Sequence, residues 1–284
     1  MNALARHLPG LVVGLLAAAP ALAAEPDYSS YARLLADHLT AGKVPDSDST
    51  ANPTLGPAGF DYQPLRGPAG RAELHAILLQ LAVSPSRMSA AERTAWAINS
   101  YNFLVIGEVV RRLEQRPSGL ASVRDVKDFF DAPVVEVEHV KYSLDAFERH
   151  FLFADFDRTS DHPPARLDPR VHFAIVCAAR ACPPLAARPY RAATLDRDLD
   201  EITRRALGSP SHVREDEATG RFAISSIFDW YEKDFGGRKG VIAFLQRYGP
   251  IRLRQAIARR GSEALSGFIA WDWRLNQPEV ARGH

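Results

Sequence analysis

The chain has 284 residues, of which 46% are hydrophobic and 24% charged, and its formal net charge is +1. This mixture is typical of a globular protein with an ample core, and it excludes a disordered or fibrous chain. A net charge close to zero provides no overall attraction for nucleic acid or for anionic lipid. We therefore expect no nucleic-acid partner.

The first 23 residues have the pattern of a secretory signal peptide. Arg6 and His7 precede an apolar stretch that ends in the small-residue sequence Ala21-Leu22-Ala23. The apolar stretch is interrupted by Pro and Gly and is shorter than the roughly 20 residues of a membrane-spanning helix. The sequence therefore predicts export to the periplasm or the medium, cleavage near Ala23, and no membrane span in the mature chain.

Residues 24–88 are predicted to form an N-terminal helical wrap and a loop. Apolar residues after Asp27 recur at helical spacing, and a second helical pattern leads up to Leu81. Between these patterns, residues 41–70 are rich in Gly and Pro, which is typical of a long loop.

Residues 89–284 are predicted to form the main domain. Ser89 and Glu92 have the spacing of a capping box, which predicts a helix from there to about Glu114. Up to residue 177, the periodicity of apolar residues and the capping signals predict a strand or hairpin over 133–142, a short helix capped by Ser143, a polar loop over 154–169 and a buried strand over 171–177. Beyond it they predict a helix over 194–207, a hairpin turning at 219–220, a helix over 226–235 and two more helices. We expect a single α+β domain with a mixed or antiparallel sheet packed by helices.

Several common site motifs are absent from the sequence. It contains no phosphate-binding loop, no dinucleotide fingerprint, no zinc-protease motif and no nucleophile elbow. The acidic run from Asp155 to Asp161 resembles the start of a calcium loop. However, Ser160 and Arg166 replace the required Gly and Glu. We expect neither a metal nor a cofactor.

Two asparagines lie in the interior of the helix predicted after Ser89. Asn99 and Asn102 are surrounded by large apolar residues, and Tyr101 lies between them. Asn disfavours helix interiors, and a buried amide without partners costs about 1–3 kcal/mol. Either these amides tie neighbouring loops to the helix, or they bind a substrate or stabilise an oxyanion.

The segment from Asp168 to Pro184 contains the two cysteines and a histidine. Cys177 and Cys182 could form a disulfide in an oxidising compartment. Alternatively, Cys182 could be a nucleophile if the loop brings it back to His172 at the start of the predicted strand. A third interpretation is that His172 is a structural residue of the core.

Five motifs in this order resemble the bacterial and plant family known as domain of unknown function 547. They are Trp96…Asn99-x-Tyr101-Asn102, Ser143-Leu-Asp…Glu148, Asp168-Pro-Arg-x-His-Phe-Ala…Cys177…Cys182-Pro, Ile224-Ser225-x-x-Phe228-x-Trp-Tyr231…Asp234-Phe, and Asp272-Trp…Leu275-Asn276. The resemblance extends from about residue 92 to 276 and implies a shared fold and site map without implying an activity. Where the family shows Glu-His, this chain has Glu148-Arg149, so only Glu148 carries over.

Three functions remain open from the sequence. The first is a thiol- and histidine-dependent hydrolase or acyl transferase, in a layout related to papain and transglutaminase enzymes, with Cys182 as nucleophile, His172 as base, and Glu148 or Asn102 orienting that base. The second is a binding module for a small molecule or peptide. The third is a redox protein that uses a reversible Cys177–Cys182 disulfide. The candidate binding residues are Asn99, Tyr101, Arg170, Ser225, Trp230 and Tyr231.

Overall fold

The computed structural model describes residues 25–40, 59–116, 118–153 and 167–278. The predicted signal peptide, the greater part of the 41–70 loop and the calcium-like run at 155–166 lie outside these residues.

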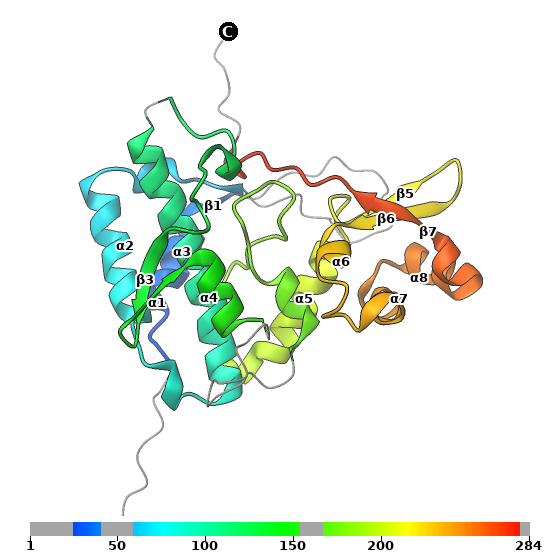
Figure 1. Cartoon of the computed structure of the whole chain (residues 1–284), viewed down its shortest axis with the longest axis horizontal. Helices are drawn as coiled ribbons and strands as arrows, with labels where there is room; N and C mark the ends of the chain where they lie inside the picture. The colour runs from blue at the N-terminus through cyan, green and yellow to red at the C-terminus, as the bar shows by residue number, and fades with distance from the viewer. Residues whose placement is uncertain (1–24, 41–58, 117, 154–166, 279–284) are drawn as a thin grey trace, which may run out of the picture.

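The described chain alternates helices with short strands (Figure 1). The α-helices are α1 (Ser29–His38), α2 (Pro68–Leu81), α3 (Ala90–Gln115), α4 (Leu144–Phe151), α5 (Leu195–Leu207), α6 (Ile227–Trp230), α7 (Gly237–Tyr248) and α8 (Ile251–Arg260). The strands are β1 (Leu39–Thr40), β2 (Gly59–Phe60), β3 (Pro133–Val137), β4 (Val140–Ser143), β5 (Val213–Asp216), β6 (Arg221–Ser225) and β7 (Leu265–Ile269). Within the described segments, no helix has both the length and the apolar character that crossing a membrane requires.

Helix α3 is the centre of the larger core. Every residue from Ala95 to Ile106 is buried, so this helix is covered on all sides. Helices α2 and α4 contact it directly, and α1 contacts α2 (Figure 1). The buried side chains of the N-terminal helices, the β3–β4 hairpin and the first part of α5 all belong to this core.

A second core lies in the C-terminal part of the chain. It contains apolar side chains of the end of α5, the three-stranded sheet, α7 and α8. In that sheet β5 pairs antiparallel with β6, and β6 pairs parallel with β7. The prediction of a single α+β domain with a mixed sheet is thus confirmed.

The predictions that depended on local capping signals are confirmed. The Ser89 Oγ accepts a hydrogen bond from the Glu92 backbone N–H, and the Glu92 carboxylate accepts one from the Ser89 N–H. Ser143 caps α4 with a single bond, its Oγ accepting from the Ala146 N–H at 3.1 Å. The hairpins at 133–143 and 213–225 also form as expected.

The strand predicted over 171–177 does not form, and this expectation is corrected. Asp168 caps a 3₁₀ helix, η4 (Pro169–Phe173), by accepting from the Arg170 N–H at 3.0 Å. Residues 174–177 have no strand partner in the described chain. Asn102 of α3 bonds this segment, and Phe173 packs against Phe228 and Phe244 of the second core. A short apolar run has the same appearance whether a sheet or a helix buries it, so the pattern could not distinguish the two cases.

The helix predicted over 226–235 is also shorter than expected. Helix α6 ends at Trp230, and tight turns continue to Gly237. Gly236 and Gly237 have φ values of 86° and 74°, a left-handed conformation that a continuing α-helix cannot contain. The turns carry Tyr231 and Asp234.

The two asparagines of α3 fix the irregular segment that follows η4. The Asn102 side chain donates to the Ala174 carbonyl at 2.9 Å and accepts from the Val176 N–H at 3.0 Å. Asn99 forms the same pair of hydrogen bonds with the N–H and carbonyl of Tyr190, at 2.9 and 2.8 Å. Each amide thus satisfies buried backbone groups that have no sheet or helix partner.

We predict that Asn102→Ala lowers the free energy of unfolding by about 2–4 kcal/mol, because it leaves a buried N–H and a buried carbonyl without partners. Urea unfolding followed by circular dichroism measures this loss. Ser100→Ala on the same helix is the matched control, since the Ser100 Oγ is buried without a partner. It should change stability by no more than about 1 kcal/mol. Equal effects of the two substitutions would contradict the structural role of Asn102.

Candidate functional site

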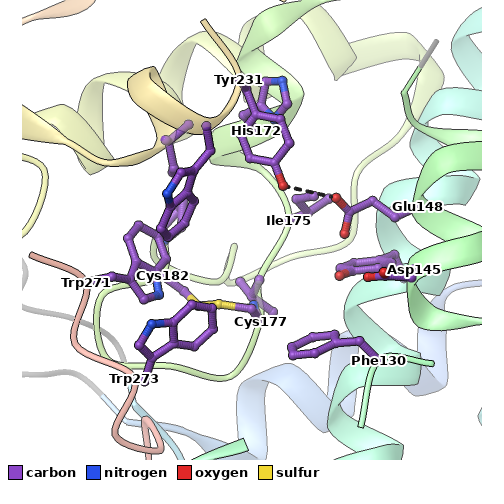
Figure 2. Close-up of a pocket in the computed structure, with 15 residues that line it drawn as sticks. Phe130, Asp145, Glu148, His172, Ile175, Cys177, Cys182, Tyr231, Trp271 and Trp273 are labelled. Carbon is purple, nitrogen blue, oxygen red and sulfur yellow. Dashed lines mark hydrogen bonds between the residues drawn. A yellow bond between two sulfur atoms is a disulfide. The ribbon is translucent and has the colours of Figure 1, made fainter. Parts of the chain in front are cut away.

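A cavity of about 210 Å³ lies between α4, η4, α6 and the C-terminal segment. We call it the aromatic cavity (Figure 2). Its lining residues are Tyr101, Phe130, Asp145, Glu148, His172, Ile175, Val176, Cys177, Cys182, Pro183, Ile227, Trp230, Tyr231, Trp271 and Trp273. In Figure 2 the carboxylates of α4 lie on one side of it, and Trp271, Trp273 and the disulfide lie on the other.

Glu148 lines the cavity because one face of α4 packs on α3 and another face borders the cavity. Phe147 packs against Trp96 of α3 with ring centroids 5.6 Å apart, whereas Asp145 and Glu148, one turn apart, line the cavity. The Tyr231 hydroxyl donates to Glu148 Oε1 at 3.5 Å (Figure 2).

Desolvation raises the pKa of Glu148 to about 7, although hydrogen bonds from Tyr101 and Tyr231 act in the opposite direction. The neighbouring Asp145, whose own pKa burial raises, adds to the increase for Glu148. Both the acid and the carboxylate form of Glu148 are therefore populated near neutral pH.

His172 is held as a neutral imidazole. Its Nε2 lies 3.0 Å from Asp234 Oδ2. Its ring stacks on Phe153 and contacts the tilted ring of Tyr231, with centroid distances of 4.3 and 4.2 Å. Burial lowers the pKa of His172, although Asp234 acts in the opposite direction. Because the carboxylate of Asp234 can only accept, we assign the ring proton to Nε2. The buried Nδ1, which has no partner, is then an unprotonated acceptor.

Cys177 and Cys182 form a disulfide in the wall of the cavity. The predicted bond is present, so the Cys182 sulfur is not a free thiolate in this state. The structure also places His172 against Asp234 and not in a pair with Cys182. The expected Cys182–His172 nucleophile and base are therefore not assembled here.

Three tryptophans surround the opening of the cavity. The Trp230 and Trp271 ring centroids are 4.9 Å apart, and Trp230 stacks on Trp273 at 6.2 Å. Trp230 is 48% exposed, an unusual exposure for so large an apolar ring. An exposed aromatic cluster beside a cavity is suited to stacking against a flat apolar or sugar-like face.

Seven of the residues selected from the sequence meet in this cavity: Tyr101, Glu148, His172, Cys177, Cys182, Trp230 and Tyr231. Asn99 and Asn102 do not line it. Their expected binding or orienting role is corrected, because their amides are used by the backbone of Tyr190, Ala174 and Val176.

Arg170 and Ser225 are likewise placed elsewhere. The Arg170 guanidinium forms ion pairs with Asp168, Asp196 and Asp200, which join η4 to α5. Ser225 is fully buried, and its Oγ lies 3.1 Å from His212 Nδ1. Both residues stabilise the fold around the site.

Other members of the site were not predicted. Asp145 precedes Glu148 by one helical turn, and Trp271 and Trp273 alternate along an extended segment, so both were detectable as same-face pairs. Asp234 contacts His172 from a distant part of the chain, and no local sequence pattern predicts that contact.

The polar groups of the cavity are suited to proton transfer. Glu148 can donate or accept a proton, and the hydroxyls of Tyr101 and Tyr231 can orient a bound oxygen or nitrogen atom. Among the described residues, no group of three or more His, Cys, Asp and Glu side chains is arranged to hold a metal ion.

We predict that Glu148→Gln stabilises the protein at alkaline pH. The folded-state pKa of about 7 exceeds the ordinary value of 4.5, so the folded chain binds this proton more tightly than the unfolded chain does. The corresponding stability is complete below about pH 4.5 and is lost as the pH rises through about 7. Near pH 8 the neutral Gln should therefore gain on the order of 2 kcal/mol relative to the wild type, a figure reduced for partial solvent screening.

Chemical unfolding at several pH values tests this expectation. The advantage of the Gln variant should shrink towards zero near pH 4.5, where both side chains are uncharged. The exposed Glu217, on the turn between β5 and β6, gives the control substitution Glu217→Gln. A pH-independent difference between Glu148→Gln and the wild type would contradict the raised pKa.

Comparison with known proteins adds one finding. No curated protein and no solved structure matches the chain. A family model, described as protein of unknown function, DUF547, matches residues 85–206.

The matched segment contains α3, the β3–β4 hairpin, α4, η4, the disulfide and most of α5. The motifs around Tyr231 and Asp272 lie beyond it. Over residues 85–206 the resemblance to the DUF547 family is confirmed.

Proposed function

We propose that the mature chain is an exported hydrolase or transferase in which Glu148 is the general acid and base. The observation that carries this proposal is the convergence of Glu148, the hydroxyls of Tyr101 and Tyr231, and the His172–Asp234 pair on one aromatic cavity. Such a grouping of titratable side chains with displaced pKa values in a cleft is typical of acid–base sites.

In the proposed mechanism, the substrate stacks on the tryptophans at the opening and presents its reacting atom to Glu148. Near pH 7 the protonated form can donate to a leaving group, and the carboxylate form can accept from an attacking hydroxyl or water. Neutral His172 contacts the ring of Tyr231 and thereby positions its hydroxyl against Glu148. The bonded cysteines contribute a wall of the cavity.

A binding module is the second candidate function. The half-exposed Trp230 and its neighbours Trp271 and Trp273 favour it, because stacking on such a cluster requires no chemistry. Three of the four tryptophans line this cavity, and only Trp96 is buried in the main core. Ligand binding in the cavity would therefore change most of the tryptophan fluorescence.

We predict that Glu148→Gln strongly lowers turnover. The mature chain is assayed with p-nitrophenyl esters, glycosides, phosphates and amides, and the most rapidly cleaved compound is used for kinetics. The substitution should lower kcat/KM by about 10²–10⁴-fold, the usual contribution of general acid–base catalysis. It should also remove a titration near pH 7 from the rate profile.

Glu217→Gln is the control and should keep full activity, because this carboxylate is exposed on the β5–β6 turn. Retained activity in Glu148→Gln would contradict the proposal. Absence of turnover, together with a carboxyl resonance of Glu148 that titrates near the ordinary value of 4.5, would also contradict it. Fluorescence changes on adding the same compounds, without turnover, would favour the binding module.

Export is proposed from the signal-peptide pattern of residues 1–23. Expression of the full chain in a bacterium with two membranes should yield a periplasmic or secreted form whose N-terminus lies near residue 24. N-terminal sequencing measures this directly. A secreted form that begins at Met1 would contradict cleavage.

A further inference from the structure

The Cys182 sulfur accepts two backbone hydrogen bonds. The Cys177 N–H donates to Cys182 Sγ at 3.1 Å, and the Ala179 N–H donates to it at 3.2 Å. A sulfur in a disulfide is a weak acceptor, whereas a thiolate is a charged and much stronger one. Both donors thus point at the atom that would carry the negative charge if the disulfide opened.

The loop that supplies these donors is held in place by contacts other than the disulfide. The Arg180 N–H donates to the Arg274 carbonyl at 2.8 Å, and the Ala181 N–H donates to the Asp272 carbonyl at 3.1 Å. The Asn276 N–H donates to the Ala178 carbonyl at 2.9 Å. Because the C-terminal segment fixes the loop backbone in this way, the donors keep their positions when the two sulfurs separate.

The two cysteines differ in exposure. Cys182 is only 5% exposed, whereas Cys177 is half-buried, and both line the aromatic cavity. An incoming thiol that enters through the cavity therefore reaches Cys177 more easily than Cys182. The accessible sulfur, Cys177, is suited to be attacked, and the sulfur with N–H donors, Cys182, is suited to leave as a thiolate. Thiol–disulfide exchange in a fixed direction requires these to be different atoms.

We propose that the Cys177–Cys182 disulfide is redox-active and exchanges with the thiol of a small molecule or of a cysteine-containing peptide. The external thiolate attacks Cys177 Sγ, the bond between Cys177 and Cys182 breaks, and its electron pair passes to Cys182 Sγ. Cys182 leaves as a thiolate held by the two N–H groups, and a mixed disulfide joins the external sulfur to Cys177.

A second external thiolate completes the exchange. It attacks the external sulfur of the mixed disulfide and releases Cys177 as a thiolate, so that two external thiols are oxidised to one disulfide while the protein is reduced to a dithiol. In the opposite direction, the reduced pair attacks an external disulfide. This activity does not depend on proton transfer by Glu148.

Charged and titratable groups around the sulfurs determine how stable a Cys182 thiolate would be. From α4, Asp145 and Glu148 line the same cavity and oppose a further negative charge. His172 and His212, whose pKa values burial lowers, are neutral at pH 7. The hydroxyls of Tyr101 and Tyr231 are uncharged there too. The charge of Arg180, which lies in the loop itself, helps to lower the pKa of Asp272. The two N–H donors are therefore the principal stabilisation of the Cys182 thiolate.

Exchange with glutathione tests the direction of attack. The oxidised mature chain is incubated with reduced glutathione at about pH 7, quenched with acid, digested and analysed by mass spectrometry. We expect reduction under native conditions, with the trapped glutathione adduct on Cys177. An adduct on Cys182, or a disulfide that opens only after denaturation, would overturn the proposal.

Alkylation of single-cysteine variants tests the stabilised thiolate. In Cys177→Ser the remaining Cys182 should react with iodoacetamide with a midpoint at least about one pH unit below the ordinary thiol pKa of about 8.5. In the matched variant Cys182→Ser, Cys177 should titrate near that ordinary value. Equal midpoints in the two variants would contradict the role of the N–H donors.

Repeating both experiments on Glu148→Gln separates this proposal from the acid–base function. Removing the opposing carboxylate should leave the glutathione adduct on Cys177 and move the Cys182 midpoint to still lower pH. Loss of turnover with intact exchange would confirm that the two activities are independent. Loss of exchange in Glu148→Gln would contradict the independent redox role.

Discussion

The architecture of the site depends on two side-chain amides that replace a missing strand. The segment from Asp168 to Tyr190 contains one 3₁₀ helix and otherwise no regular element, yet much of it is buried. Backbone groups in such a segment need partners, and Asn99 and Asn102 provide them from α3 with paired donor and acceptor bonds. The helix thereby fixes the backbone between His172 and Cys177, and the C-terminal segment fixes the loop that leads to Cys182.

This construction explains why the cavity has few charges and why one of them is sensitive to pH. Aromatic and apolar side chains from both cores surround the polar groups and partly desolvate them. Under that desolvation, burial keeps His172 neutral and raises the pKa of Glu148 to about 7. The proposed acid–base role and the proposed redox role share the cavity but use different atoms.

Local signals in the sequence predicted the elements that form through local interactions. The Ser89–Glu92 box and the Ser143 cap involve residues only three positions apart, so α3 and α4 begin where expected. The apolar run at 171–177 was wrongly predicted as a strand, since it begins in a 3₁₀ helix, and Asn102 of α3 and the aromatic rings of the second core bury it without a sheet. The candidate site was found in part, because the family motifs contain Glu148 and Tyr231, and because His172 opens an apolar run. Asp234 lies in one of the family motifs, but its contact with His172 could not be predicted, because that contact joins distant segments.

The return of the C-terminal segment across the cysteine loop has a consequence for the order of folding. Strand β7 pairs in parallel with β6, and the three helices α6, α7 and α8 separate them in the chain, so this pairing closes a long stretch of sequence. The segment after β7 then brings Trp271 and Trp273 to the cavity and bonds the backbone of Ala178, Arg180 and Ala181. Contacts of such long sequence separation form slowly, because chain entropy is lost before they are made. The α3–α4 core can assemble early from nearby residues, whereas the cavity is completed only when the last described residues have docked.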